Sequence, residues 1–193
     1  MKNLKTITRN LLILGLVAFI GCGVFSIHPL YHEEDLIVNL DLVGIWENID
    51  DKDYIRIDTI KDKKYRFMWY EAEDTIYFEA GLVKLDNHYF FDMYPYDDPN
   101  TEDSEIGDNF WKNFIPAHSF TKLELKEDTI SMAEFDSKRL ITLFKENRVR
   151  LAHELPDDNY VVITASTNDL QKFVSRYADD TDAFNESDSY RRL

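Results

Sequence analysis

The sequence predicts a mainly β fold with two helices in its C-terminal third, in which an antiparallel meander closes into a barrel or half-barrel. Aromatic residues make up 14% of the chain, and most are Phe or Tyr, which are enriched in strands. Short runs of alternating apolar and polar residues follow one another between residues 54 and 94. The hydrophobic period changes to that of a helix only after Asp136.

The alternating runs predict consecutive antiparallel strands. Tyr65, Phe67 and Trp69 share one face of the second run, and acidic turns separate the runs. The alternation shifts phase at Gly81, which predicts a β-bulge. The run at residues 87–94 carries aromatic residues on both faces. The predicted strands are residues 54–60, 64–71, 75–85, 87–94, 117–126 and 129–135.

Helical periodicity appears twice in the last third of the chain. Asp136 is expected to cap a helix that ends near Asn147. A hairpin is expected at residues 151–165, around an acidic turn. Residues 166–169 then have the order of a capping box, and a second helix follows whose apolar residues recur at i, i+3, i+4 and i+7.

The N-terminus has the three-part layout of an export signal. Three cations precede an apolar run of about ten residues, and Gly21 then precedes Cys22, the only cysteine of the chain. The apolar run is too short for a permanent span, because about 20 residues are needed to cross a bilayer. We therefore expect residues 1–21 to be removed.

The segment Phe19-Ile20-Gly21-Cys22 resembles the lipobox of bacterial lipoproteins. In that family the thiol carries a diacylglyceryl group and the new amino terminus is usually acylated. The resemblance implies that Cys22 begins an exported mature protein, anchored to a bacterial membrane on its periplasmic or cell-surface side. Two or three acyl chains hold a protein durably, since each buried methylene contributes about 0.8 kcal/mol. An ordinary secretory signal with a chance cysteine is the alternative.

Further motifs resemble a family of uncharacterised bacterial lipoproteins, which implies no particular activity. The triplet Gly44-x-Trp46 is also similar to the lipocalin signature, in which the Trp closes the barrel floor beside an arginine from a late strand. It implies a lipocalin-like barrel, with an ordinary buried Trp as the alternative. The motifs are Pro29-Leu30-Tyr31, Glu34-Asp35-Leu36, Leu42-Val43-Gly44-x-Trp46, Ala152-His153-Glu154 and residues 163–167.

These features predict one folded domain with a segment on either side. About 172 residues remain after removal of the signal, which is enough for one well-buried core. No second cysteine is present, so no intramolecular disulfide forms. The predicted parts are a signal peptide at residues 1–21, a lipidated tether at 22–35, a β-rich domain at 36–178 and a loose polar tail at 179–193, pinned by Phe184.

The charge narrows the range of partners. The formal net charge is −15, and it becomes about −18 once the three leader cations are removed. Such a surface repels phosphate backbones, so nucleic-acid binding is not expected. It also opposes docking on anionic lipid through charge, which leaves attachment to the acyl chains.

No catalytic motif is present. The sequence lacks a GxSxG elbow, an HExxH helix and a phosphate-binding glycine loop, so we expect a non-enzyme with no cofactor beyond its acyl anchor. His88, His118 and His153 lie in or beside predicted strands. We expect them to be structural, with His118 and His153 as the two worth testing for catalysis.

Metal sites are also not expected. His28 and His32 have a spacing that could ligate zinc on a helix, but Pro29 follows at once and no third ligand is apparent. The acidic residues at 97–108 could attract calcium, but they lack the EF-hand order of ligands, so a solvated loop is the expectation.

Two functions remain open at this stage. The first is an anchored module that binds a small apolar ligand inside the barrel. The second is an envelope interaction or structural protein whose filled core presents an acidic surface to another envelope component. Burial of both faces of residues 87–94 would indicate a filled interior and favour the second function. The predicted ligand-binding residues are Trp46, Tyr65, Phe67, Trp69 and Phe78.

Overall fold

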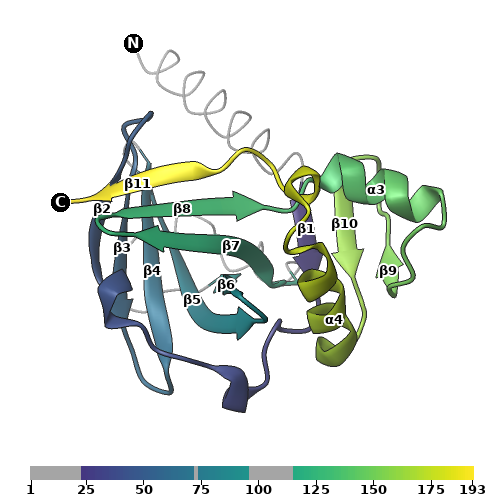
Figure 1. The fold of residues 1–193 in the computed structure, drawn as a ribbon, viewed down its shortest axis with the longest axis horizontal. Coiled ribbons are helices and arrows are strands. Elements are labelled where there is room, and N and C mark those ends of the chain that lie inside the picture. Colours follow the sequence, from purple (N-terminus) through teal and green to yellow (C-terminus); the bar gives the residue numbers. More distant parts are fainter. Residues whose placement is uncertain (1–22, 72–73, 96–114) are drawn as a thin grey trace, which may run out of the picture.

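The computed structural model describes residues 23–71, 74–95 and 115–193 (Figure 1). Eight strands form a closed antiparallel barrel in the order β11-β2-β3-β4-β5-β6-β7-β8, and a second sheet has the order β1-β10-β9. The two α-helices, α3 and α4, lie beside the second sheet (Figure 1). The predicted mainly β fold, with a meander that closes into a barrel and two helices late in the chain, is confirmed.

Six of the eight barrel strands, β3 to β8, agree with the predicted runs to within two residues at each end. Phe67 of β4 pairs with Ile57 of β3 and with Phe78 of β5, so the alternating residues share the interior face. The final strand, β11, lies between β8 and β2 and closes the barrel. The strands are β2 (Gly44–Asn48), β3 (Tyr54–Thr59), β4 (Lys64–Glu71), β5 (Asp74–Leu85), β6 (His88–Pro95), β7 (Ser119–Lys126), β8 (Thr129–Glu134) and β11 (Asp188–Arg192).

The predicted bulge at Gly81 is wrong. β5 pairs with β6 in an uninterrupted register from Phe78 to Leu85, across Gly81, and its pairing with β4 is regular up to Gly81. A Cβ atom on Gly81 would lie 2.8 Å from Leu36 Cδ2 and 2.9 Å from Tyr31 Cε1. The alternation of apolar and polar residues shifts at Gly81 because β5 is covered on both faces there. The barrel interior covers one face, and the N-terminal segment covers the other.

The remaining elements surround the barrel. Both predicted helix caps are confirmed, because the Asp136 side chain accepts from the backbone N–H groups of Lys138 and Arg139, and Ser166 accepts from that of Asp169. The elements are β1 (Gly23–Ser26), η1 (Glu33–Asp35), η2 (Leu40–Leu42), α3 (Ser137–Lys145), β9 (His153–Glu154), β10 (Tyr160–Ile163), α4 (Thr167–Tyr177) and η3 (Thr181–Ala183).

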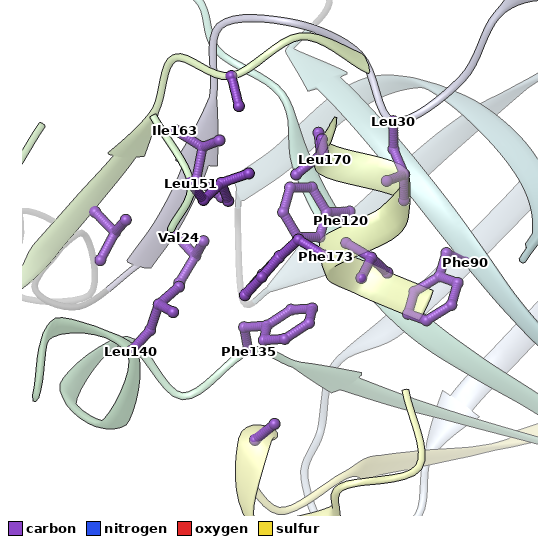
Figure 2. Close-up of a cluster of buried hydrophobic side chains, with 14 of the residues drawn as sticks. Val24, Leu30, Phe90, Phe120, Phe135, Leu140, Leu151, Ile163, Leu170 and Phe173 are labelled. Atoms are coloured by element: carbon purple, nitrogen blue, oxygen red, sulfur yellow. The ribbon is translucent and has the colours of Figure 1, made fainter. Parts of the chain in front are cut away.

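The described residues form two hydrophobic cores, one inside the barrel and one outside it. The outer core lies between the barrel wall, the second sheet and the two α-helices (Figure 2). Figure 2 shows Leu170 and Phe173 of α4 in this core, where Phe173 stacks on Phe135 with ring centroids 5.5 Å apart. Phe90 belongs to the outer core and the adjacent Phe91 to the inner one, and both are fully buried. Both faces of β6 are therefore covered.

The sequence predicts a tether at residues 22–35, but residues 23–35 are part of the fold. β1 pairs in parallel with β10, and the backbones of Ser26 and His118 exchange two hydrogen bonds of 2.8 Å. Leu30 is fully buried in the outer core. The segment is ordered because its apolar residues complete that core. Cys22 and the predicted signal peptide lie outside the described residues.

The predicted loose tail at residues 179–193 is also wrong. β11 pairs with β8 and β2, and its Tyr190 side chain is 1% exposed. The strand was missed because Asp188 and Arg192, which alternate with Tyr190, are charged. Phe184 does pin this region as predicted, since its ring centroid lies 4.4 Å from that of Phe135.

Deletion of residues 188–193 is expected to unfold the barrel, because β2 and β8 lose their shared neighbour and Tyr190 leaves the core. The measurement is thermal unfolding followed by near-UV circular dichroism, and the deleted protein should show no cooperative transition. Deletion of Leu193 alone, which is 71% exposed, should shift the midpoint by less than about 4 °C. An unchanged unfolding midpoint after deletion of residues 188–193 would contradict the closure of the barrel by β11.

Candidate functional site at the ends of the barrel

One end of the barrel is closed by a tryptophan and an arginine. Trp46 is fully buried, and its Nε1–H donates to the carbonyl oxygen of Leu42 at 3.0 Å. The guanidinium carbon of Arg192 lies 4.1 Å from the centroid of the Trp46 ring, within cation–π distance. Arg192 also donates to the carbonyl oxygens of Val43, at 2.9 Å, and Asp41. This is the arrangement that the likeness of Gly44-x-Trp46 to the lipocalin signature implies.

Gly44 makes this closure possible. Its φ is +150°, in the region that favours glycine, and a Cβ atom there would lie 2.7 Å from Nη1 of Arg192. The glycine of the triplet thus gives the arginine room to reach the Trp ring. Sequence reasoning missed Arg192 because it assigned the residue to a loose tail. The late arginine of the lipocalin signature was the signal that could have identified it.

The middle of the barrel is filled by side chains. Trp46 and Tyr65 are 0% exposed and Phe67 is 1% exposed, so these three predicted ligand-binding residues are core residues. The Phe91 ring centroid lies 5.5 Å from that of Tyr65 and 6.2 Å from that of Phe67. Two open surface grooves, of about 260 and 690 Å³, lie at the β3–β4 turn and between α4 and the β5–β6 turn. Neither is lined by these three core residues.

The other two predicted ligand-binding residues, Trp69 and Phe78, are half-buried. Trp69 lies towards the barrel end opposite Arg192. Its Nε1–H donates to Oδ2 of Asp53 at 2.8 Å, and the Tyr190 hydroxyl donates to the same oxygen at 3.1 Å. Burial, together with the charge of Asp53, raises the pKa of the Tyr190 hydroxyl. The buried Asp53 carboxylate therefore joins β4 and β11 above the filled core.

Acidic side chains lie further towards this end. Glu134 and Asp188 occupy inward positions of β8 and β11, two residues beyond Met132 and Tyr190 of the inner core. Both reach water at the barrel end. Desolvation by the surrounding walls, and then the charge of Asp188, raise the pKa of the Glu134 carboxyl. Desolvation, and then neighbouring carboxylates such as Asp53, raise the pKa of Asp188.

The three histidines that were predicted to be structural all have hydrogen-bond partners. His118 Nδ1 lies 2.6 Å from Oδ1 of Asp92, a carboxylate that is 1% exposed. His88 Nε2 lies 2.8 Å from Oδ1 of Asp179, and His153 Nδ1 lies 2.7 Å from the carbonyl oxygen of Leu151.

The Asp92 carboxylate ties the N-terminal segment to the barrel. Besides its bond to His118, it accepts a hydrogen bond of 2.6 Å from the backbone N–H of Leu30. One buried carboxylate therefore joins β6, the residue that leads into β7, and the chain that follows β1.

No metal-binding cluster of three or more His, Cys, Asp or Glu side chains occurs among the described residues. The His32 Nε2 atom lies 3.0 Å from Oδ1 of Asn168, which ties the N-terminal segment to α4. The acidic loop at residues 97–108 lies outside the described residues, so the expectation that it is solvated stays a prediction.

Comparison with family models, with curated proteins and with solved structures gave no match for this chain. The relationship to a lipoprotein family therefore stays a prediction. No helix in the described part of the chain is both long enough and apolar enough to cross a membrane.

Substitution Arg192→Ala is expected to lower the free energy of unfolding by about 2–4 kcal/mol, because it removes two charged hydrogen bonds and a cation–π contact. Arg191→Ala is the matched control on the same strand, since Arg191 contacts the exposed Glu47 at 3.3 Å. This control should lose less than about 1 kcal/mol. Urea titration measures the free energy of unfolding of both variants. Equal losses in the two variants would refute the role of Arg192 in closing this end of the barrel.

Substitution Asp92→Asn is expected to lower the free energy of unfolding by about 2 kcal/mol, because a buried amide cannot replace a carboxylate that accepts two hydrogen bonds. Backbone amides of residues 23–36 should then exchange faster with deuterium. The control is Glu124→Gln on the exposed face of β7, with an expected loss of less than about 0.5 kcal/mol. Unchanged exchange in residues 23–36 would argue against this role of Asp92.

Proposed function

We propose that the chain is a lipid-anchored protein of the bacterial cell envelope whose barrel is a filled scaffold that acts through its acidic surface. The observation that carries the proposal is the complete burial of both Phe90 and Phe91, on opposite faces of β6. An apolar ligand in the middle of the barrel would have to displace side chains that already contact one another. The partner is then another envelope component, bound from outside.

The anchor rests on the N-terminal sequence and on where the fold begins. The export signal and the likeness of residues 19–22 to a lipobox support acylation of Cys22. β1 begins at the next residue, and the Gly23 N–H donates to the carbonyl oxygen of Asn159 at 3.2 Å. An acylated Cys22 would thus hold the folded domain directly at the membrane surface, without an intervening flexible segment.

The role is non-enzymatic and needs no cofactor besides the acyl anchor. This part of the proposal rests on the absence of a catalytic motif from the sequence and on the structural partners of His88, His118 and His153. Each of these ring nitrogens is held by a carboxylate or a carbonyl oxygen, and two of the histidines are tied to distant parts of the chain.

Substitution Cys22→Ala is expected to release the protein from the membrane fraction and to abolish labelling by a radioactive fatty acid, because the thiol that would carry the anchor is gone. Gly21→Ala is the matched control, since it keeps a small residue before Cys22 and should keep both membrane association and labelling. Unchanged fractionation and labelling of Cys22→Ala would refute the anchor.

The filled interior is tested with an apolar fluorescent probe, N-phenyl-1-naphthylamine, added to residues 23–193 expressed without the leader. We expect no saturable binding below about 10 µM. Phe91→Ala is the positive comparison, because removal of the ring leaves a cavity that small apolar molecules enter. Tight one-to-one binding to the unsubstituted domain would instead favour the alternative function, an apolar-ligand carrier.

A further inference from the structure

The second sheet has one face in the outer core and another face that is only partly covered. Val24 of β1 and Ile163 of β10 belong to the outer core. Side chains alternate between the two faces of a strand, and Phe25 pairs with Val162, so the other face carries Phe25, Val162 and Tyr160. These three side chains are half-buried, and none of them belongs to either hydrophobic core.

Ile27 continues this partly covered face beyond the end of β1. Its N–H donates to the carbonyl oxygen of Ile163 at 2.9 Å, which keeps the chain beside β10. Its side chain is 44% exposed. Phe25, Ile27, Tyr160 and Val162 together form an apolar surface, which we call the β1 face.

The β1 face begins next to the residue that is proposed to carry the anchor. Gly23 pairs with Tyr160, and a Cβ atom on Gly23 would lie 2.7 Å from Cε2 of Phe25, so the Phe25 ring lies over Gly23. The centroids of the Phe25 and Tyr160 rings are 6.3 Å apart. Consecutive Cα atoms are about 3.8 Å apart, so the Cα atoms of Phe25 and Cys22 are at most about 11 Å apart. Two aromatic rings therefore lie within a short reach of Cys22.

We propose that the β1 face docks on the surface of a zwitterionic phospholipid bilayer, the membrane that holds the acyl chains of Cys22. The proposal rests on the proposed acylation of Cys22, and it adds which side of the domain faces the lipid. The headgroup region is about 5–8 Å thick on each side of a bilayer, so a face so close to the anchor is held at that depth. Aromatic rings are enriched there, because an apolar ring with a polar edge suits the interface.

The charge beside the β1 face selects the kind of lipid. The turn before Tyr160 contains Asp157 and Asp158, and both are exposed. Asp158 is paired with Lys145 at 2.7 Å, whereas Asp157 accepts from the backbone N–H groups of Asn159 and Tyr160. This turn would be repelled by anionic headgroups, and a zwitterionic surface imposes no such repulsion.

The test attaches residues 22–193 to phosphatidylcholine nanodiscs through the Cys22 thiol and a maleimide lipid, with ¹³C-labelled isoleucine methyl groups. A water-soluble gadolinium chelate relaxes methyl groups that it can approach. Attachment should lower the relaxation of the Ile27 methyl group at least about threefold, relative to the domain capped with N-ethylmaleimide in solution, because lipid excludes the chelate. Ile45 is the internal control: it is 40% exposed on β2, which lies across the barrel from β1 (Figure 1), and it should keep its relaxation.

Substitution Phe25→Glu should abolish the protection of Ile27, because it places a carboxylate at the lipid interface. The matched control is Tyr54→Glu, at an aromatic position of β3 that is 39% exposed, and this variant should keep the protection. If Phe25→Glu fails to fold, Tyr160→Glu replaces it.

Chemical attachment separates this inference from the anchor. If Cys22→Ala leaves fractionation and labelling in cells unchanged, the anchor is refuted, and the coupled domain still shows whether the β1 face contacts lipid. Docking is overturned by equal relaxation of Ile27 in the attached and free domains, by undiminished protection in Phe25→Glu, or by stronger protection on phosphatidylglycerol. Protection that rises with protein concentration in solution would also overturn it, since a second copy of the chain would then cover the face.

Discussion

The fold depends on closure of the barrel by its last strand. A meander of seven strands leaves two open edges, at β2 and at β8, and unpaired strand edges tend to pair with other chains. β11 satisfies both edges at once, through the pairs Tyr190 with Asn48 and Tyr190 with Ile130. The chain reaches this position only after the second sheet and both α-helices, so closure joins residues that are far apart in sequence.

The long segment between β8 and β11 is held in place by the outer core. Phe135 lies at its start and Phe184 lies near its end, and the two rings are in contact. The N-terminal segment enters the same core through Leu30, whose backbone N–H is bound by the buried Asp92. The outer core thus fixes the points where the chain enters and leaves the barrel, and it covers the outer face of β6.

The sequence predicted the parts of the fold whose pattern is local. Alternation identified β3 to β8, and the caps at Asp136 and Ser166 were found because each involves only neighbouring residues. β1 was missed because a parallel pairing with β10 leaves no trace in either segment alone. β11 was missed because its inward residues Asp188 and Arg192 are charged. Both lie at the ends of the barrel, where an inward side chain need not be apolar.

Local sequence pattern also predicted only part of the candidate site. Trp46, Tyr65 and Phe67 were identified as interior residues, but alternation cannot distinguish a filled interior from a hollow one. Only the contacts of Phe91 with Tyr65 and Phe67 do so.

The two barrel ends use charge in opposite ways. At one end the Arg192 guanidinium is stabilised in place, because it donates to backbone carbonyl oxygens and lies over the Trp46 ring. At the other end carboxylates accumulate, and among the residues that the structure describes there, Asp53 alone accepts side-chain hydrogen bonds, from Trp69 and Tyr190. A closed end that satisfies its own cation contributes to stability. The other end gives up stability, because desolvation and the repulsion between neighbouring carboxylates disfavour the charged forms of Glu134 and Asp188.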